Sequence, residues 1–273
     1  MACAGLSLTA AAASGYTPRG DFYKISETEY RIAPGVTENR LVLNKTGGDQ
    51  QETVYAVSVD VANPTVGFMV GYADYPTNPN SFRWKMQKVR DQAAAATNVT
   101  GANIVAAFNA DTFNMQTGEP TGCLVMGGNI FKEGLGRPYL GVTKTGEYVM
   151  GESLTEETLR TLREGVSAFY PLVKNGKRTG PGKDPESNIA PKTAIGRKAD
   201  GSFVVVAVDG RNQPISCNLS DYDLATILLD LGCVDALNFD GGGSTTYLAK
   251  YEGKSTLELA NKPSDAVERQ VAS

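Results

Sequence analysis

The sequence predicts an α+β fold, a single domain in which a mixed, largely antiparallel sheet is flanked by helices. Two patterns lead to this prediction. Apolar segments of strand length recur along the chain, and segments with helical periodicity stand between some of them without regular alternation. The length of 273 residues suits one large domain, which we expect to span residues 21–273.

Several segments are expected to be extended. Residues 54–61 alternate apolar and polar side chains, which is typical of a half-buried strand. Residues 65–70 follow an Asn63-Pro64 turn and are expected to pair with that strand in a hairpin-like arrangement. The other expected extended segments are 103–108, 203–208, 234–239 and 245–249.

Helix signals occur between these segments. Ser81 precedes apolar residues at helical spacing, which predicts a helix that ends at about Thr97. Two capping boxes, at residues 153–156 and 220–223, predict two further helices. Residues 174–190 are rich in Gly, Pro, Lys and Asn, and we expect them to form a mobile surface loop.

The composition excludes several classes of protein. The chain has no histidine, so it contains neither a Ser-His-Asp or Cys-His catalytic group nor an imidazole-bound zinc ion. Acid–base chemistry must therefore use carboxylates, Lys, Tyr, Cys or water. A net charge of −4 without a basic tract argues against nucleic acid as a partner. No apolar run approaches the roughly 18 residues that a transmembrane helix needs.

Residues 1–20 are expected to lie outside the fold. They begin with small, weakly apolar side chains, which is typical of a signal-peptide remnant, or of a tag or linker. We therefore expect the protein to be extracellular or in the cell envelope. In such an oxidising compartment Cys217 and Cys233, which flank one expected helix, could form a disulfide; free thiols are the alternative.

Three aspartates occupy equivalent places in the chain. Asp111, Asp209 and Asp240 each stand just past the end of an apolar strand-like run. A strand end is rigid on one side and open on the other, which suits a reactive side chain. If the strands are neighbours, the carboxylates converge into a catalytic site; the alternative is that each belongs to an ordinary turn. Converging carboxylates could also bind Ca²⁺ or Mg²⁺, which prefer oxygen ligands.

A run of glycines follows the third of these aspartates. Gly241, Gly242 and Gly243 exceed what a hairpin turn needs, and successive glycine amides can form a concave nest for phosphate. The run is not a Walker loop, because no Gly-Lys-Ser/Thr follows it. We therefore expect an oxyanion or a closely approaching sugar at this backbone.

Three cations stand near these motifs. Arg211 follows Asp209 by two residues, and a guanidinium group can bind phosphate through two nitrogens. Lys192 and Arg197 bracket another short segment and could add positive charge. The alternative for each is a solvated or ion-paired surface role.

Six segments occur in an order and spacing that resemble a known family. They are FNADTFN (108–114), PLVKNG (171–176), PKTAIGRKADG (191–201), VVVAVDGR (204–211), LNFDGGGSTT (237–246) and NKPSDAVER (261–269). Together they resemble the phosphodiester glycosidase family, whose domain is shared by the mannose 6-phosphate uncovering enzyme and bacterial exopolysaccharide-associated proteins. The resemblance covers roughly residues 50–270.

The resemblance implies hydrolysis of a glycosyl-phosphodiester, such as an N-acetylglucosamine-1-phosphodiester, to a free sugar and a phosphomonoester. The partner would be a sugar-phosphate or polysaccharide substrate. Catalysis is expected from Asp111, Asp209 and Asp240. The residues expected to bind the substrate or its phosphate are Asn109, Lys192, Arg197, Gly210, Arg211, Gly241, Gly242, Gly243 and Ser244.

The chain departs from the family pattern at two places. The segment around Asp111 is poorer in glycine than usual, and Lys192 stands where the family usually carries arginine. Relatives also often continue past the segment 261–269. These departures leave the substrate, and the presence of further domains, open.

Two other functions fit the same residues. A divalent-metal phosphodiesterase would use the three aspartates as ligands and direct attack at phosphorus. A non-catalytic module that binds envelope polysaccharide would use exposed aromatic side chains near the site, such as Phe113, Tyr139 or Tyr247.

Overall fold

The computed structural model describes residues 16, 21–48, 51–211 and 218–273. The expected signal-peptide remnant or linker, except Tyr16, lies outside the described residues, and so does Cys217. Cys233 is a buried free thiol.

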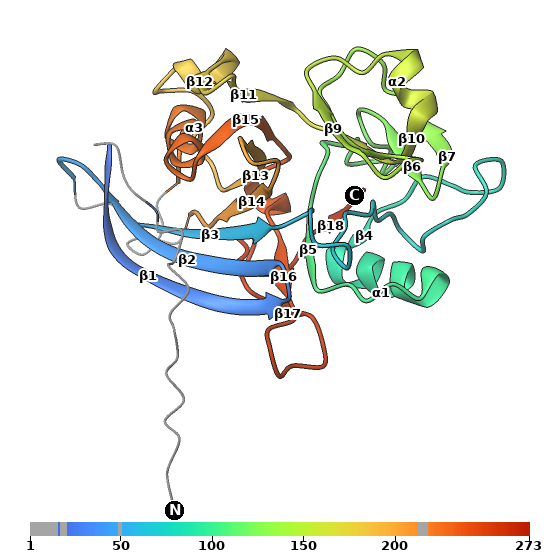
Figure 1. Cartoon of the computed structure of the whole chain (residues 1–273), viewed down its shortest axis with the longest axis horizontal. Helices are drawn as coiled ribbons and strands as arrows, with labels where there is room; N and C mark the ends of the chain where they lie inside the picture. The colour runs from blue at the N-terminus through green and yellow to red at the C-terminus, as the bar shows by residue number, and fades with distance from the viewer. Residues whose placement is uncertain (1–15, 17–20, 49–50, 212–217) are drawn as a thin grey trace, which may run out of the picture.

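An antiparallel sheet of eight strands forms one side of the molecule (Figure 1). Its strand order is β1-β2-β3-β14-β13-β15-β11-β12. In chain order the strands are β1 (Phe22–Ala33), β2 (Val36–Lys45), β3 (Gln51–Val59), β11 (Tyr170–Lys174), β12 (Lys177–Arg178), β13 (Lys192–Lys198), β14 (Phe203–Val208) and β15 (Cys233–Asn238).

A second antiparallel sheet, of five strands, lies beside the first (Figure 1). It comprises β6 (Leu124–Met126), β7 (Asn129–Lys132), β8 (Tyr139–Thr143), β9 (Tyr148–Gly151) and β10 (Leu162–Ser167). Smaller sheets pair β5 (Ala106–Phe108) with β16 (Tyr247–Ala249) and β17 (Glu258–Leu259), and β4 (Gln87–Lys88) with β18 (Gln270–Val271). The chain ends between the two large groups of strands (Figure 1).

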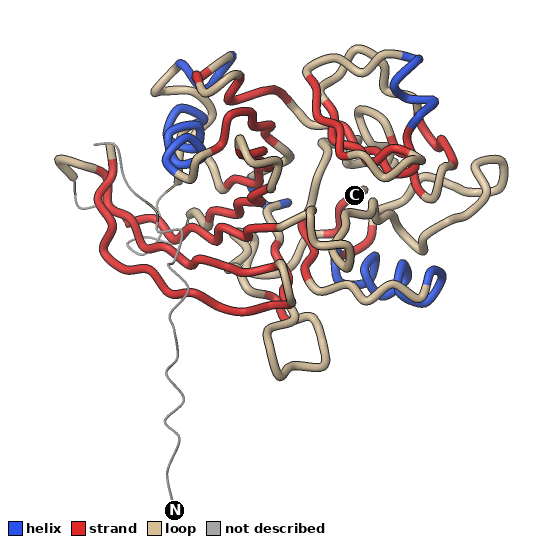
Figure 2. The backbone as a smooth tube through the Cα atoms, in the orientation of Figure 1, coloured by secondary structure: helices blue, strands red, loops and turns tan. Residues whose placement is uncertain are grey.

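Helices are short and few among the described residues (Figure 2). They are α1 (Val89–Thr100), α2 (Glu156–Thr161) and α3 (Asp221–Asp230), with 3-10 turns η1 (Gly180–Lys183) and η2 (Gly242–Ser244). The expected mixture of helices and antiparallel strands is therefore present. The prediction of one principal sheet is corrected, because the strands divide into several sheets and outnumber the helices.

The helix predictions differ in how well they hold. The capping box of Ser220 and Asp223 is present and begins α3 as expected. In α2 the side chain that caps the helix belongs to Thr155 rather than Ser153. The helix expected to begin after Ser81 begins only at Val89.

Aromatic packing explains the late start of α1. Phe82 and Trp84 lie edge to face with ring centroids 4.6 Å apart, and both pack edge to face on Tyr72. The hydroxyl of Tyr72 also accepts a hydrogen bond from the amide of Lys85 at 2.7 Å. These tertiary contacts hold the segment out of the helix despite its apolar spacing.

Several strand predictions are confirmed and others are wrong. The segments at 54–61, 203–208 and 234–239 correspond to β3, β14 and β15. Residues 65–70 do not form a hairpin with β3, whose ladder partners are β2 and β14. Within the expected strands at 103–108 and 245–249, only the residues of β5 and β16 form strands.

Two hydrophobic cores lie on opposite faces of the eight-stranded sheet. Val54, Val204 and Val206 belong to the core beneath α3, whereas Val57 and Val205 belong to the core on the other face. Side chains alternate between the faces of a strand, so β3 and β14 are buried on both sides. This explains why residues 203–208 read as a continuous apolar run.

A cavity of about 560 Å³ lies against the second of these faces, between the sheet and α1. Its walls are mainly apolar and come from β3, β14, α1 and the segments 65–71 and 102–110. The cavity is partly open to solvent rather than fully enclosed.

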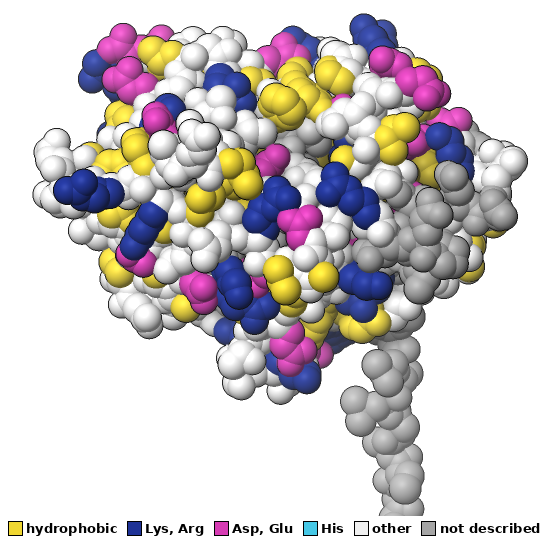
Figure 3. All heavy atoms as spheres, turned by 180° about the vertical axis from the view of Figure 1, so that it is seen from behind, with side chains coloured by type: hydrophobic (Ala, Val, Ile, Leu, Met, Phe, Trp, Pro, Cys, Tyr) yellow, Lys and Arg dark blue, Asp and Glu magenta, His cyan; other side chains and the backbone are white. Residues whose placement is uncertain are grey.

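The surface carries mixed charges. Lys and Arg side chains alternate with Asp and Glu on the face shown in Figure 3, without a broad patch of one sign. Within the ranges that the structure describes, no helix is long and apolar enough to cross a membrane.

A buried ion pair ties α3 to the sheet. The ammonium group of Lys192, at the start of β13, lies 2.5 Å from a carboxylate oxygen of Asp221, and both side chains are almost fully buried. The hydroxyl of Tyr170 donates to the other carboxylate oxygen of Asp221 at 2.5 Å. Burial lowers the pKa of Lys192, and the adjacent Asp221 opposes this shift.

We expect Lys192→Met to lower the free energy of unfolding by about 3–5 kcal/mol, because it leaves the Asp221 carboxylate buried without its cation. The matched control is Lys174→Met, which breaks an exposed pair with Glu152 and should cost about 1 kcal/mol or less. Urea unfolding measures both values. Equal losses would contradict a stabilising role for the buried pair.

Candidate active site

The sheet topology brings two of the three expected aspartates to one edge. Strand β13 lies between β14 and β15 and is antiparallel to both, with Lys192 opposite Val208 and Ala194 opposite Asn238. Strands β14 and β15 consequently end at the same edge, where β13 begins. Asp209 follows β14 and Asp240 follows β15, so both leave the sheet at this edge.

The third motif joins the same edge through β5 and β16. Phe108 pairs with Tyr247, and the amide of Asp240 donates to the carbonyl of Ala110 at 2.7 Å. The backbone of the segment that carries Asp111 therefore lies directly against the backbone of the segment that carries Asp240.

Asn109 holds this junction together. Its side-chain nitrogen donates to the Asp240 carbonyl at 2.8 Å. Its side-chain oxygen accepts from the Thr193 hydroxyl at 2.8 Å and from the Thr246 amide at 3.0 Å. The residue is 1% exposed. Asn109 was expected to bind substrate, but its position makes it the link between three strand ends.

The Asp240 carboxylate lies at this junction in a partly buried position. Its Oδ1 accepts from the Gly241 amide at 3.0 Å. Burial raises its pKa above the ordinary value, and the Ser244 hydroxyl, the Gly241 amide and the charge of Arg269 oppose that shift. Ser244 is fully buried beside it. The carboxyl is thus poised to exchange a proton at a higher pH than a surface aspartate.

Close packing explains the glycine run. A β-carbon at Gly241 would lie 2.5 Å from the Pro191 carbonyl oxygen, and one at Gly243 would lie 2.0 Å from Nη2 of Arg269. Gly242 has a φ of +61°, which favours glycine. The run therefore lets a strand end and an arginine approach the bare backbone.

The expected phosphate nest is corrected in part. The Gly241 amide donates to Asp240, and the Gly242 amide donates to the Pro191 carbonyl at 2.9 Å. These two amides are already engaged within the protein. An oxyanion at this backbone would therefore depend on nearby cations rather than on the full row of glycine amides.

Arg211 supplies one such cation. A β-carbon at Gly242 would lie 3.5 Å from Nη2 of Arg211, so the guanidinium group stands close to the glycine run. Arg211 has a φ of +59° and is exposed. The preceding Gly210 is buried against Pro191, where a β-carbon would come within 3.0 Å of the proline ring. Gly210 thus serves packing at the turn that presents Arg211.

Asp209 is held by several hydrogen bonds. Its Oδ2 accepts from the Tyr55 hydroxyl at 3.0 Å. Its Oδ1 accepts from the Lys262 amide at 2.9 Å and from the Asn261 side chain at 3.2 Å. Burial raises its pKa, and these hydrogen bonds oppose the shift. Asp209 therefore fixes the chain around residue 261 to the end of β14.

Asp111 is 1% exposed and turns towards the five-stranded sheet. Its carboxylate accepts from the Gly122 amide at 2.6 Å and lies 3.6 Å from Nη2 of Arg137. Burial raises its pKa, and the Gly122 amide and Arg137 oppose that shift. Arg137 is thus a second guanidinium group near these motifs, besides that of Arg211. The sequence analysis did not identify it.

The three aspartates do not form a cation site. Among the described residues, no group of three or more Asp, Glu, Cys or His side chains is arranged to hold a metal ion. The reason is visible in the contacts above, because Asp209 and Asp111 direct their oxygens to separate donors. The sequence left open whether Asp111, Asp209 and Asp240 ligate Ca²⁺ or Mg²⁺, and their arrangement in the described residues does not favour this.

Two expected phosphate-binding cations lie elsewhere. The side chain of Lys192 points to Asp221, as described above. Arg197 lies towards the other end of β13 and pairs with Asp235 at 2.5 Å. Neither the guanidinium group of Arg197 nor the ammonium group of Lys192 is directed to the glycine run.

The segment 261–269, to which the sequence analysis gave no role, also reaches the glycine run. Arg269 donates through Nε and Nη2 to Oδ2 of Asp265 at 2.9 and 2.6 Å, and this pair lies against Gly243. Arg269 belongs to the NKPSDAVER motif, but the sequence alone does not show which residues the charged side chains of this motif contact. In the structure Glu268 accepts from the Arg90 amide at 3.0 Å, and the charge of Arg269 acts to lower the pKa of Asp240.

The aromatic side chains proposed for a binding module belong to the cores. Tyr247 is fully buried and stacks on Phe108 with centroids 4.5 Å apart. Tyr139 is 9% exposed, and Phe113 packs against two cores. They provide no exposed platform for a polysaccharide.

Residues 102–273 match the profile of the phosphodiester glycosidase family, and this region includes all three aspartates, the glycine run and Arg269. The chain belongs to the phosphodiester glycosidase family.

Relatives within and around this family support the assignment. The bovine N-acetylglucosamine-1-phosphodiester alpha-N-acetylglucosaminidase is 29% identical over 210 residues, which is 70% of this chain and 37% of the bovine protein. An uncharacterized SPbeta prophage-derived protein of Bacillus subtilis is 40% identical over 81 residues, which is 30% of this chain and 12% of that protein. The phosphodiester glycosidase domain described here thus spans little more than a third of the bovine enzyme's length.

The fold is also that of a solved structure. The catalytic domain of zebrafish N-acetylglucosamine-1-phosphodiester alpha-N-acetylglucosaminidase, auto-inhibited by its pro-peptide, matches with a TM-score of 0.68 at 20% identity. The match covers 92% of this chain and 86% of the zebrafish domain. The likeness extends over both large sheets of this phosphodiester glycosidase fold.

The raised pKa of Asp240 predicts an opposite pH trend to that of a surface aspartate. Burial makes the protonated carboxyl more favourable in the folded protein than in the unfolded chain, so wild-type stability falls as pH rises through that pKa. Asparagine does not ionise. The Tm of Asp240→Asn relative to wild type should therefore increase between about pH 4 and about pH 7.

Asp200→Asn is the matched control. The hydroxyl and amide of Ser202 lower the pKa of Asp200, so its ionised form stabilises the folded protein. The relative Tm of this variant should decrease over the same pH interval. Calorimetry measures both series, and parallel trends would show that Asp240 is not penalised by burial.

Proposed function

We propose that this protein hydrolyses a glycosyl-phosphodiester and releases a sugar and a phosphomonoester. The observation that carries the proposal is the convergence of two guanidinium groups, from Arg211 and Arg269, on adjacent glycines beside the Asp240 carboxylate. Family membership and the names of the relatives support the same reaction.

The two guanidinium groups would bind the phosphodiester. Arg211 and Arg269 reach the glycine run from different segments of the chain, and Arg269 is oriented by Asp265. A departing phosphomonoester is a weak base, so it needs charge neutralisation more than protonation. Fixed donors aimed at a developing negative charge are the largest contribution in many enzymes.

The Asp240 carboxylate would act at the anomeric carbon. Its backbone is fixed through Asn109 and Ala110, and of the neighbouring glycines Gly242 is the one at which a β-carbon would meet only Arg211, at 3.5 Å. Asp240 either attacks the anomeric carbon or takes a proton from an attacking water. In both cases the bond between the anomeric carbon and the phosphate oxygen breaks, and water supplies the new hydroxyl group of the sugar.

The remaining residues support this arrangement. We assign Asn109 and Asp209 positioning roles, because each links segments of the site through several hydrogen bonds. Asp111, with Arg137, forms the wall towards the five-stranded sheet. The names of the relatives favour N-acetylglucosamine as the sugar. An extracellular or envelope location fits the weakly apolar N-terminus.

Kinetics on an N-acetylglucosamine-1-phosphodiester test these roles. Asp240→Asn, Arg211→Ala and Arg269→Ala should each lower kcat by about a hundredfold or more, because each removes transition-state stabilisation. The matched control is Arg160→Ala, which removes an exposed arginine paired with Glu156 on α2 and should leave kcat unchanged.

Hydrolysis in ¹⁸O-labelled water identifies the bond that breaks. Label in the sugar shows attack at carbon, as proposed, whereas label in the phosphomonoester shows attack at phosphorus. Wild-type rates for both Asp240→Asn and Arg211→Ala in an active protein would refute the assignment, as would label in the phosphate.

A further inference from the structure

We propose that the cavity between the eight-stranded sheet and α1 binds a single aliphatic chain. This site is separate from the proposed reaction, because none of the three aspartates, Arg211 or Arg269 is among its lining residues. Its volume of about 560 Å³ lies within the range of cavities that hold small ligands, about 300–1,000 Å³.

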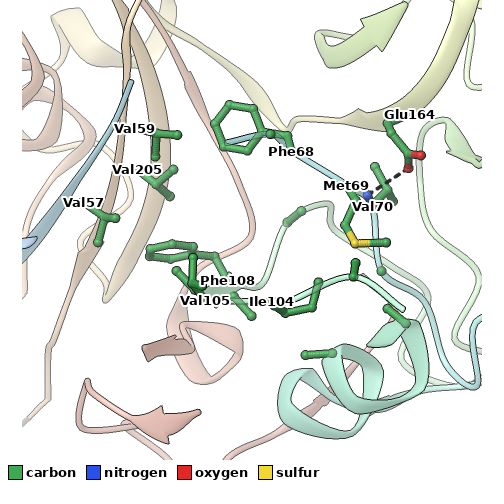
Figure 4. A pocket seen from close by; sticks show the side chains of 18 of the residues that line it. Val57, Val59, Phe68, Met69, Val70, Ile104, Val105, Phe108, Glu164 and Val205 are labelled. Carbon is green, nitrogen blue, oxygen red and sulfur yellow. Dashed lines mark hydrogen bonds between the residues drawn. The ribbon is translucent and has the colours of Figure 1, made fainter. Parts of the chain in front are cut away.

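Most of the side chains that line the cavity are aliphatic, and many of them are branched. Figure 4 shows Val57, Val59 and Val205 on the sheet side, and Ile104 and Met69 on the opposite side. Beyond them lie Ala93 and Ala96 of α1. The lining therefore offers continuous apolar contact from the sheet to the helix, which suits an extended hydrocarbon.

The aromatic residues of the cavity already have ring partners. Phe68 packs edge to face on Tyr148 and Phe203, with centroids 5.8 and 5.4 Å apart. Phe108 stacks on Tyr247. These engaged rings favour an aliphatic ligand over a flat aromatic one.

Two polar side chains of the lining, those of Glu164 and Gln92, are engaged as well, whereas the buried Ser273 hydroxyl has no hydrogen-bond partner among the described residues. The Glu164 carboxylate accepts from the amides of Val70 and Gly127 at 3.1 and 3.2 Å (Figure 4). The side-chain nitrogen of Gln92 donates to the carbonyls of Gln87 and Val271. A sugar or a phosphate group would find few partners here and would lose its hydration, so the cavity selects against polar ligands.

One wall gives a chain a way to enter. Residues 66–72 belong to no helix or strand, and Val66, Phe68 and Val70 line the cavity from this segment. The cavity is partly open to solvent, so the entry of a chain does not require a strand to leave the sheet. The opposite wall includes Asn109 and Phe239, so a bound chain would contact the back of the segments that carry the aspartates.

Fluorescence titration with cis-parinaric acid, a single-chain fatty acid, tests the proposal on the full purified chain. We expect saturable binding below the critical micelle concentration, displacement by dodecanol, and a higher Tm with ligand. Dodecanol lacks the carboxylate, so its competition shows that the hydrocarbon is recognised. No sugar substrate is needed, so this result is independent of whether the protein hydrolyses a phosphodiester.

Val105→Phe and Val59→Phe narrow the cavity from two different walls and should each weaken binding by about tenfold or more. The matched control is Val99→Phe on the exposed side of α1, which should bind as wild type does. Circular dichroism establishes that each variant is folded. Absence of saturable binding by the wild type, or unchanged affinity in a folded Val105→Phe or Val59→Phe protein, would overturn the proposal.

Discussion

The antiparallel register of β14, β13 and β15 is the constraint on which the site depends. It places the ends of β14 and β15 at one edge, on either side of the start of β13. A slip of one residue would turn every side chain of a strand to the opposite face. The two buried cores therefore fix the register, and the register in turn fixes where Asp209 and Asp240 leave the sheet.

The donors that surround the three aspartates explain why these buried carboxylates are tolerated. Burial raises the pKa of Asp111, Asp209 and Asp240, and each is surrounded by donors that oppose the shift. The donors differ in kind, and so do the consequences. The Tyr55 and Asn261 side chains, the Lys262 amide and the charge of Lys262 hold the buried Asp209. Asp240 is less buried and lies beside the glycine run, which fits the role proposed for it.

Local sequence signals predicted the elements whose formation depends on few neighbours. The capping box at Ser220 and Asp223 and the apolar run 203–208 were both sufficient to identify α3 and β14. Helix α1 was placed too early because the packing of Phe82 on Trp84 and Tyr72 is tertiary. Strand β1 gave little signal because most of its side chains are exposed.

In the candidate site, too, local sequence predicted some features, whereas others depend on tertiary contacts. Motif position identified Asp240 and Arg211, which stand beside strand ends and glycines. It could not show that Lys192 faces Asp221 or that Arg197 faces Asp235, because both partners lie far away in the sequence. For the same reason Arg269 received no role, although its segment had been recognised as characteristic.

Residues 261–273 contact several parts of the candidate site. Asn261 and Lys262 hold Asp209, Arg269 lies against Gly243, and the carbonyl of Ser273 accepts from the amide of Ala110. One short segment thus couples the supports of Asp209 and Asp240 with the chain beside Asp111, so a disturbance anywhere in it reaches all three.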